Sequence, residues 1–224
     1  MHHTNSILAT FIVLFRIALT QTYNIQTPPF FLYLVSDDAD FQGKFLSPCH
    51  IGAGESTLCY NSASNISSDP SLYTYALNTT ADEPTDPSAE IYGAPGVLTW
   101  NLPYNGNQFE SIPMSFVPAR SVSGVALLDF EPGPASGGTQ IAFDDNNFMN
   151  VQTVFANATE TGLVYGSSNE AYYRWYMCNA TEPPGDYNYW TLSWDLSSAT
   201  PADSSCCAVQ VWRMFMPQAG QPNP

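Results

Sequence analysis

The chain has 224 residues and is strongly acidic, with 20 Asp and Glu against 5 Lys and Arg and a formal net charge of −15. A surface this acidic repels phosphate backbones and anionic lipid headgroups, so we expect neither nucleic-acid binding nor adsorption to anionic membranes. Hydrophobic residues make up 44% of the chain, which is enough for a substantial folded core.

Residues 1–20 have the arrangement of a secretory signal peptide. An apolar stretch, Ile7–Phe15, is followed by the small residues Ala18 and Thr20, which stand at positions −3 and −1 of a cleavage site. A membrane anchor is the alternative, but the apolar run is too short to span a bilayer and Arg16 interrupts it. We therefore predict that the mature protein is secreted and extracellular.

The mature chain reads as a series of short strands. Proline, glycine and asparagine recur too often for long helices, and no long stretch keeps a 3.6-residue apolar period. Runs rich in β-branched and aromatic residues lie between turn residues, as strands do. The predicted strands are Phe30–Ser36, Lys44–Ser47, Thr57–Tyr60, Tyr73–Leu77, Gly96–Leu102, Ile112–Val117, Val125–Phe130, Gln140–Phe143, Met149–Ala156, Gly162–Tyr165, Ala171–Cys178, Tyr189–Asp195 and Ala208–Met214.

Several of these strands alternate apolar and polar residues. In the next-to-last one, the apolar face consists of Trp190, Leu192, Trp194 and Leu196. A strand with one apolar face needs a second layer, which predicts an all-β, antiparallel β-sandwich of two packed sheets. A β-trefoil-like barrel is the alternative. We expect one β-rich domain over residues 21–224 with long loops, and a meander of the last three strands.

The five cysteines of a secreted chain are interpreted first as disulfides. Local pairing favours Cys49 with Cys59, and Cys178 with either Cys206 or Cys207, which leaves one thiol over. A metal site is not expected, because only His50 remains beyond the signal segment and the cysteine spacings match no zinc pattern.

Four sequons mark candidate glycosylation sites on the surface. They begin at Asn65, Asn78, Asn157 and Asn179. Roughly three sequons are expected by chance in a chain this rich in Asn, Ser and Thr. Their significance therefore comes from the predicted secretion.

No catalytic residues are predicted. A Ser-His-Asp site would have to use His50, for which a local hydrogen bond is the favoured role, and no G-x-S-x-G turn is present. A pair of carboxylates could still hydrolyse a glycosidic bond. The candidates lie at strand ends, where solvated turn residues are the favoured interpretation; they are Asp129, Glu131, Asp144 and Asp145.

Aromatic residues indicate a candidate ligand surface. Planar rings stack on sugars, and we single out Tyr172, Tyr176 and Tyr189, with Arg174 among them. Cross-strand packing is the favoured interpretation of the tyrosines. For Arg174 and Arg213, stacking on aromatic rings within the fold is expected.

Three segments carry a family resemblance. They are G-K-F-L-S-P-C-H-I-G-A-G-E-S-T-L-C (43–59), G-V-L-T-W-N-L (96–102) and A-Y-Y-R-W-Y-M-C (171–178). In these segments the chain resembles a family of secreted proteins of unknown function from filamentous fungi. The resemblance implies a Cys49–Cys59 bond and a bond from Cys178 to a C-terminal cysteine. It implies no activity and no cofactor.

Together these features predict a secreted protein that binds rather than catalyses. We expect it to be associated with the cell wall or released, with a glycan-binding or effector-like role. Its partners would be cell-wall polysaccharide or host extracellular components. The alternative is a carbohydrate-active hydrolase that uses two carboxylates.

Overall fold

The structure is a computed structural model, and it describes residues 23–52, 54–61, 70–80, 91–105, 108–132, 138–159, 162–182, 187–196 and 205–216. The predicted signal segment 1–20 and the sequon at Asn65 lie outside these residues. Among the described residues, no helix is both long and apolar enough to cross a membrane.

The described part of the chain is built from β-strands and one 3₁₀ turn, η1 (Pro70–Tyr73). In chain order the strands are β1 (Ile25–Gln26), β2 (Phe30–Val35), β3 (Phe45–Gly52), β4 (Glu55–Asn61), β5 (Tyr75–Thr79), β6 (Gly96–Tyr104), β7 (Gln108–Pro118), β8 (Val125–Phe130), β9 (Gln140–Phe143), β10 (Met149–Thr159), β11 (Gly162–Tyr172), β12 (Trp175–Glu182), β13 (Tyr187–Asp195) and β14 (Cys206–Phe215).

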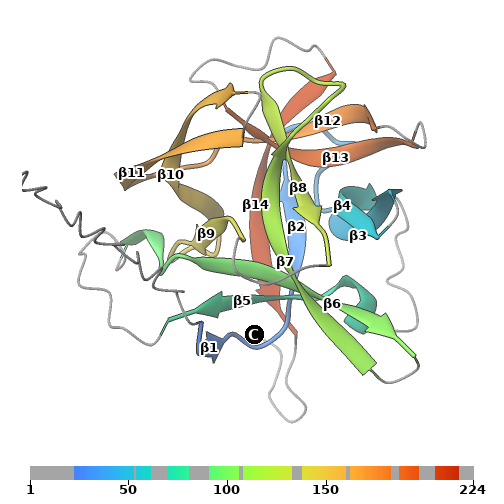
Figure 1. Ribbon diagram of the computed structural model, residues 1–224, viewed down its shortest axis with the longest axis vertical. Helices are drawn as coiled ribbons and strands as arrows, with labels where there is room; N and C mark the ends of the chain where they lie inside the picture. Colours follow the sequence, from blue (N-terminus) through green and yellow to red (C-terminus); the bar gives the residue numbers. More distant parts are fainter. Residues whose placement is uncertain are drawn as a thin grey trace, which may run out of the picture.

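The strands pair antiparallel throughout and curl into two layers around a core, which confirms the predicted all-β sandwich. In Figure 1, β14 and β2 run through the centre, the β10–β11 hairpin projects to the upper left, and β12 and β13 lie at the upper right. The strand path is β1-β5-β2-β14-β12-β13-β4-β8-β7-β6-β9-β10-β11, and β3 pairs with β2 and β4.

The C-terminal strand, β14, lies between the N-terminal strand β2 and strand β12. On one side β14 pairs with β2 over six residue pairs, from Gln210 opposite Val35 to Phe215 opposite Phe30. On its other side it pairs with β12. The predicted meander of the last three strands is therefore wrong, because β12 is the middle strand and pairs with both β13 and β14. Strand β14 therefore pairs with the edge of β12 that lies opposite β13.

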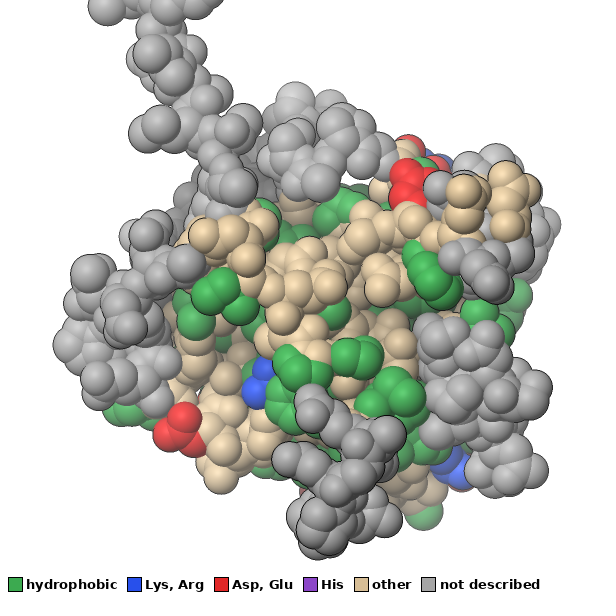
Figure 2. Space-filling model, turned by 90° about the horizontal axis from the view of Figure 1, so that it is seen from below, with side chains coloured by type: hydrophobic (Ala, Val, Ile, Leu, Met, Phe, Trp, Pro, Cys, Tyr) green, Lys and Arg blue, Asp and Glu red, His purple; other side chains and the backbone are tan. Residues whose placement is uncertain are grey.

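The main core is apolar and rich in aromatic rings. It includes Phe30, Leu98, Phe130, Met177 and Leu192, each almost fully buried. Burial of such side chains contributes about 1.5–3 kcal/mol each, so this cluster is the main stabilising feature. On the face seen from below, the described surface shows uncharged polar side chains and backbone with patches of hydrophobic side chains, and few acidic or basic ones (Figure 2).

Strand β13 is buried on both faces, which the alternation did not predict. Leu192 and Trp194 face the main core, and Thr191, Ser193 and Asp195 on the opposite side are also buried. A second, smaller cluster covers that opposite side, with Val122, Val125, Leu127, Cys178 and Ala180 as its buried members. The segment between β7 and β8 supplies Val122 and so adds a cover that the pattern of a single strand cannot show.

Two disulfides join neighbouring strands. Cys49 of β3 is bonded to Cys59 of β4, and Cys178 of β12 is bonded to Cys206 of β14. Cys178 and Cys206 are also register partners in the sheet. Cys207 is the free thiol. Because its side chain lies on the other face of β14, it packs against the main core instead.

Removing the Cys178–Cys206 bond is expected to lower the free energy of unfolding by roughly 3.5 kcal/mol, because the unfolded chain regains the entropy of a 28-residue loop. The double variant C178A/C206A makes the comparison and prevents Cys207 from replacing Cys206 as the partner of Cys178. Urea unfolding followed by tryptophan fluorescence measures the change. The control is C207A, which removes no cross-link and should lose clearly less; equal losses would contradict the prediction.

Candidate functional site

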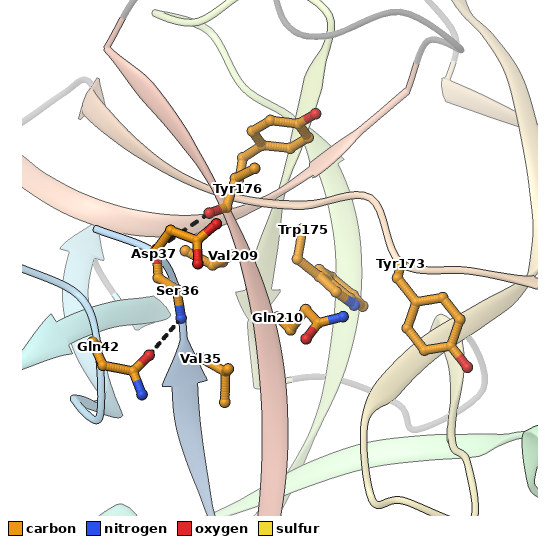
Figure 3. Close-up of a pocket in the computed structure, with 10 residues that line it drawn as sticks. Val35, Ser36, Asp37, Gln42, Tyr173, Trp175, Tyr176, Val209 and Gln210 are labelled. Atoms are coloured by element: carbon orange, nitrogen blue, oxygen red, sulfur yellow. Dashed lines mark hydrogen bonds between the residues drawn. The ribbon is translucent and has the colours of Figure 1, made fainter. Parts of the chain in front are cut away.

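An open groove lies where β2 ends beside β14 and β12. It has a volume of about 500 Å³ and is drawn in Figure 3. Its walls combine the turn after β2, the exposed end of β14 and the start of β12, because Val35 pairs with Gln210 and Trp175 pairs with Val209. The lining residues are Val35, Ser36, Asp37, Gln42, Tyr173, Trp175, Tyr176, Ala208, Val209 and Gln210.

One side of the groove is polar and is held by hydrogen bonds within the turn after β2. The backbone N–H of Ser36 donates to Gln42 Oε1 at 2.7 Å, and the Ser36 hydroxyl donates to the Ala208 carbonyl at 3.4 Å. The Oε1 atom of Gln42 is thus already used as an acceptor, and its Nε2 group can donate hydrogen bonds to a ligand. With Asp37 and Gln210, the groove presents amide donors and both amide and carboxylate acceptors.

The other side of the groove is aromatic. Trp175 is buried and its indole N–H donates to the Met149 carbonyl at 2.7 Å, so it forms the floor. Tyr173 donates its hydroxyl to Asp144 Oδ2 at 2.8 Å. Burial first, and then the bond to Asp144, raise the pKa of Tyr173, so it stays a neutral donor. Tyr176 lies on the opposite side of Trp175 from Tyr173 (Figure 3).

The structure does not bring together the four residues that the sequence singled out as ligand contacts. Tyr176 lines the groove. The Arg174 guanidinium lies 4.7 Å from the Tyr172 ring centre, and the Tyr172 hydroxyl donates to Glu170. Tyr189 is exposed on β13, outside the groove lining. The sequence analysis did not single out Tyr173. In the predicted strand Ala171–Cys178 this residue alternates onto the same face as Trp175, which is buried.

A second hollow, the acid pocket, has a volume of about 360 Å³ and is lined by Ile51, Glu55, Val117, Pro118, Arg120, Leu127, Asp129 and Glu131. Strand register explains the grouping. Thr57 of β4 lies opposite Asp129 of β8, so Glu55, two residues earlier on the same face, comes beside Glu131. Leu127, Asp129 and Glu131 share one face of the β8 segment for the same reason.

Asp129 is not the solvated turn residue that we expected. It is 7% exposed, and its Oδ1 atom is buried without a hydrogen-bond partner. Burial, then the charges of Glu55 and Glu131, raise its pKa from 3.8 to about 7, against a lowering by the backbone hydrogen bond from Phe130. An acid at a strand end becomes buried here because β4 and β7 pair with β8 on either side.

Asp144 is a turn residue, as expected. Its Oδ1 accepts the backbone N–H groups of Asn146 and Phe148, each at 2.9 Å, in the tight turn before β10. Asn147 in this turn has a φ of 65°, a conformation that asparagine tolerates well. Asp145 is exposed. Asp144 and Asp145 therefore do not line the acid pocket with Asp129 and Glu131.

The other candidate residues lie on the surface or have structural roles. His50 is exposed on β3 opposite Ser56. Asn179 is exposed on β12, and Asn78 of β5 accepts a hydrogen bond from Gln26 at 2.9 Å. Asn157 lies in β10, and its side chain is outside the described part. Among the described residues, no group of three His, Cys, Asp or Glu could hold a metal ion.

Comparison with known protein families gives a match over most of the chain. Residues 27–215 match the model of a family described as a domain of unknown function, DUF7907. No curated protein and no solved structure matches the chain. The match covers every strand that lines the groove and the acid pocket, so both sites belong to the matched domain.

Proposed function

The chain belongs to the DUF7907 family, whose description names no activity, and we propose from its groove that it is a secreted, non-enzymatic glycan-binding protein. The observation that carries this proposal is the pairing of two tyrosines with a polar wall of amides, a hydroxyl and a carboxylate. Its place of action would be the cell wall or the surrounding medium. An effector-like role toward host components is one form of the same proposal.

Secretion is supported by several independent features. Residues 1–20 have the pattern of a signal peptide. Two disulfides are compatible with an oxidising, extracellular environment. The sequon at Asn179 has an exposed asparagine, as a glycoprotein would need. We further propose that the family is the fungal secreted one that residues 43–59 and 171–178 resemble.

Sugar binding is supported by the chemistry of the groove. Pyranose rings have apolar C–H faces and a rim of hydroxyl groups that both donate and accept hydrogen bonds. Tyr173 and Tyr176 offer aromatic surface for the first, and their hydroxyls offer polar contacts. Gln42, Gln210 and Asp37 supply donors and acceptors for the second. The groove is open, which suits a chain of sugars better than an enclosed small molecule.

The arrangement of acids favours binding over hydrolysis. Glycoside hydrolysis requires two carboxyl groups on either side of a bound sugar. Asp37 is the one carboxylate among the residues that line the groove. Asp129, Glu131 and Glu55 line the other pocket, whose walls are aliphatic rather than aromatic. The acid pocket, where the paired acids lie, therefore has no aromatic side chain among its described lining residues on which a sugar could stack.

Binding to insoluble chitin and β-glucan, with a glycan array, tests the proposal. We expect Tyr176→Ala to weaken binding about tenfold, which corresponds to about 1.4 kcal/mol. Because Tyr176 also packs against the smaller core cluster, Q42A and Q210A serve as variants of exposed residues. The matched control is Tyr189→Ala, an exposed tyrosine outside the groove. The proposal would be overturned if the unmodified protein bound none of the wall polysaccharides, or if all three groove variants bound as well as it does.

A further inference from the structure

The acid pocket combines an excess of acidic groups with a buried acceptor that has no hydrogen-bond partner. Three carboxylates line it against one cation, Arg120, so its lining charge is −3 + 1 = −2 when all four groups are ionised. Oδ1 of Asp129 is buried with no hydrogen-bond partner. A buried acceptor in this state lowers the stability of the fold, more so if it is charged, and a ligand that donates a hydrogen bond would offset that loss.

We propose that the acid pocket binds a primary ammonium group carried on a short aliphatic stem. This site is separate from the groove, and the proposal does not depend on glycan binding. The ligand could be a free alkylamine or the side chain of a lysine, which share this chemistry.

An ammonium group fits the distribution of acids. One of its N–H donors can serve Asp129, and the nearby carboxylates of Glu55 and Glu131 attract the positive charge. A guanidinium is planar and favours one carboxylate that it can bind through two parallel hydrogen bonds.

The remaining walls fit the aliphatic stem. Ile51, Val117, Pro118 and Leu127 line the pocket beside the acids, and Ile51 and Leu127 are themselves buried. Alkyl chains with a charged tip bury the stem against such surface and keep the tip at polar groups. A small inorganic cation would make no use of these walls, so the lining selects for an organic one.

Binding should be linked to the ionisation of Asp129. The charged groups that line the pocket with it are Glu55, Glu131 and Arg120. An ammonium ion stabilises the ionised form of Asp129, so its pKa of about 7 should fall in the complex. We therefore expect binding at pH 5 to be at least about tenfold weaker than at pH 8.

The test is a titration of the intact secreted protein with n-butylammonium chloride, followed by the carboxyl carbon resonances of Asp and Glu. A second arm uses Nα-acetyl-lysine methylamide, a mimic of a lysine side chain. Tetramethylammonium chloride at equal ionic strength is the control for charge alone, since it has no N–H donor. Saturable shifts with either amine support the proposal, and the stronger of the two identifies the source.

Variants distinguish binding of the ammonium group in the acid pocket from nonspecific attraction of a cation to an acidic protein. Asp129→Asn keeps the shape of the side chain and should weaken binding at least about tenfold at pH 8, and Glu131→Gln should weaken it less. Asp145→Asn removes an exposed acid outside the pocket and should leave binding unchanged. Equal binding by Asp129→Asn and the unmodified protein, equal shifts with tetramethylammonium, or no saturable shift with either amine would overturn the proposal.

Discussion

Replacing Asp129 with asparagine is expected to raise the free energy of unfolding above pH 7 and to change it little near pH 4. The folded pKa of Asp129 is about 7, against 3.8 for an exposed carboxyl group. Between these values the folded state holds a proton that the unfolded state has lost, so stability falls as pH rises from about 4 to 7. The difference of about 3 pKa units corresponds to at most about 4 kcal/mol.

Urea unfolding of both proteins at pH 4, 5.5, 7 and 8 measures this difference. The remaining acids also titrate over this range and change the stability of both proteins alike. The gap between the two curves therefore isolates Asp129. The control is Asp145→Asn. Because Asp145 is exposed, the free energy of unfolding of this variant should differ little from that of the unmodified protein at every pH. If Asp129→Asn follows the same pH profile as the unmodified protein, Asp129 is not a buried acid in solution.

The strands that the sequence predicted best are short and end at turn residues. Val125–Phe130 and Gln140–Phe143 match β8 and β9 at both ends. Each is a mostly apolar run followed by acids or proline, which stop the pattern. The stacking predicted for the two arginines also occurs. Arg213 lies 4.4 Å from the Phe143 ring centre and 4.6 Å from that of Phe215.

Prediction was poorer where residues from distant parts of the chain meet. Glu55 joins Asp129 because β4 pairs with β8, and no local pattern specifies that pairing. The boundary between β11 and β12 also differs from the predicted one. We expected strands at Gly162–Tyr165 and Ala171–Cys178, but β11 continues to Tyr172 and β12 begins at Trp175. The break between them is what lets Tyr173 turn to Asp144 and line the groove.

The largest loss of stability is expected from Trp175→Ala, at about 4 kcal/mol. Trp175 is 1% exposed and belongs to the main core. Its ring centre is 4.6 Å from that of Trp194 and 6.1 Å from that of Phe116, and its indole N–H donates to the Met149 carbonyl of β10. Alanine would leave a cavity and an unsatisfied carbonyl. Trp212→Ala is the control, because that ring is only half-buried and should cost clearly less.

Trp175→Phe divides the loss into its two parts. Phenylalanine keeps most of the ring packing but removes the indole N–H, so the loss should fall to about 1–3 kcal/mol, the cost of an unpaired buried carbonyl. Because Trp175 forms the floor of the groove between Tyr173 and Tyr176, the two variants should also differ in binding. Under conditions where both are folded, we expect Trp175→Ala to lose glycan binding and Trp175→Phe to retain it. Equal binding by both would mean that the floor does not position the tyrosines, and that Tyr173 is held by Asp144 alone.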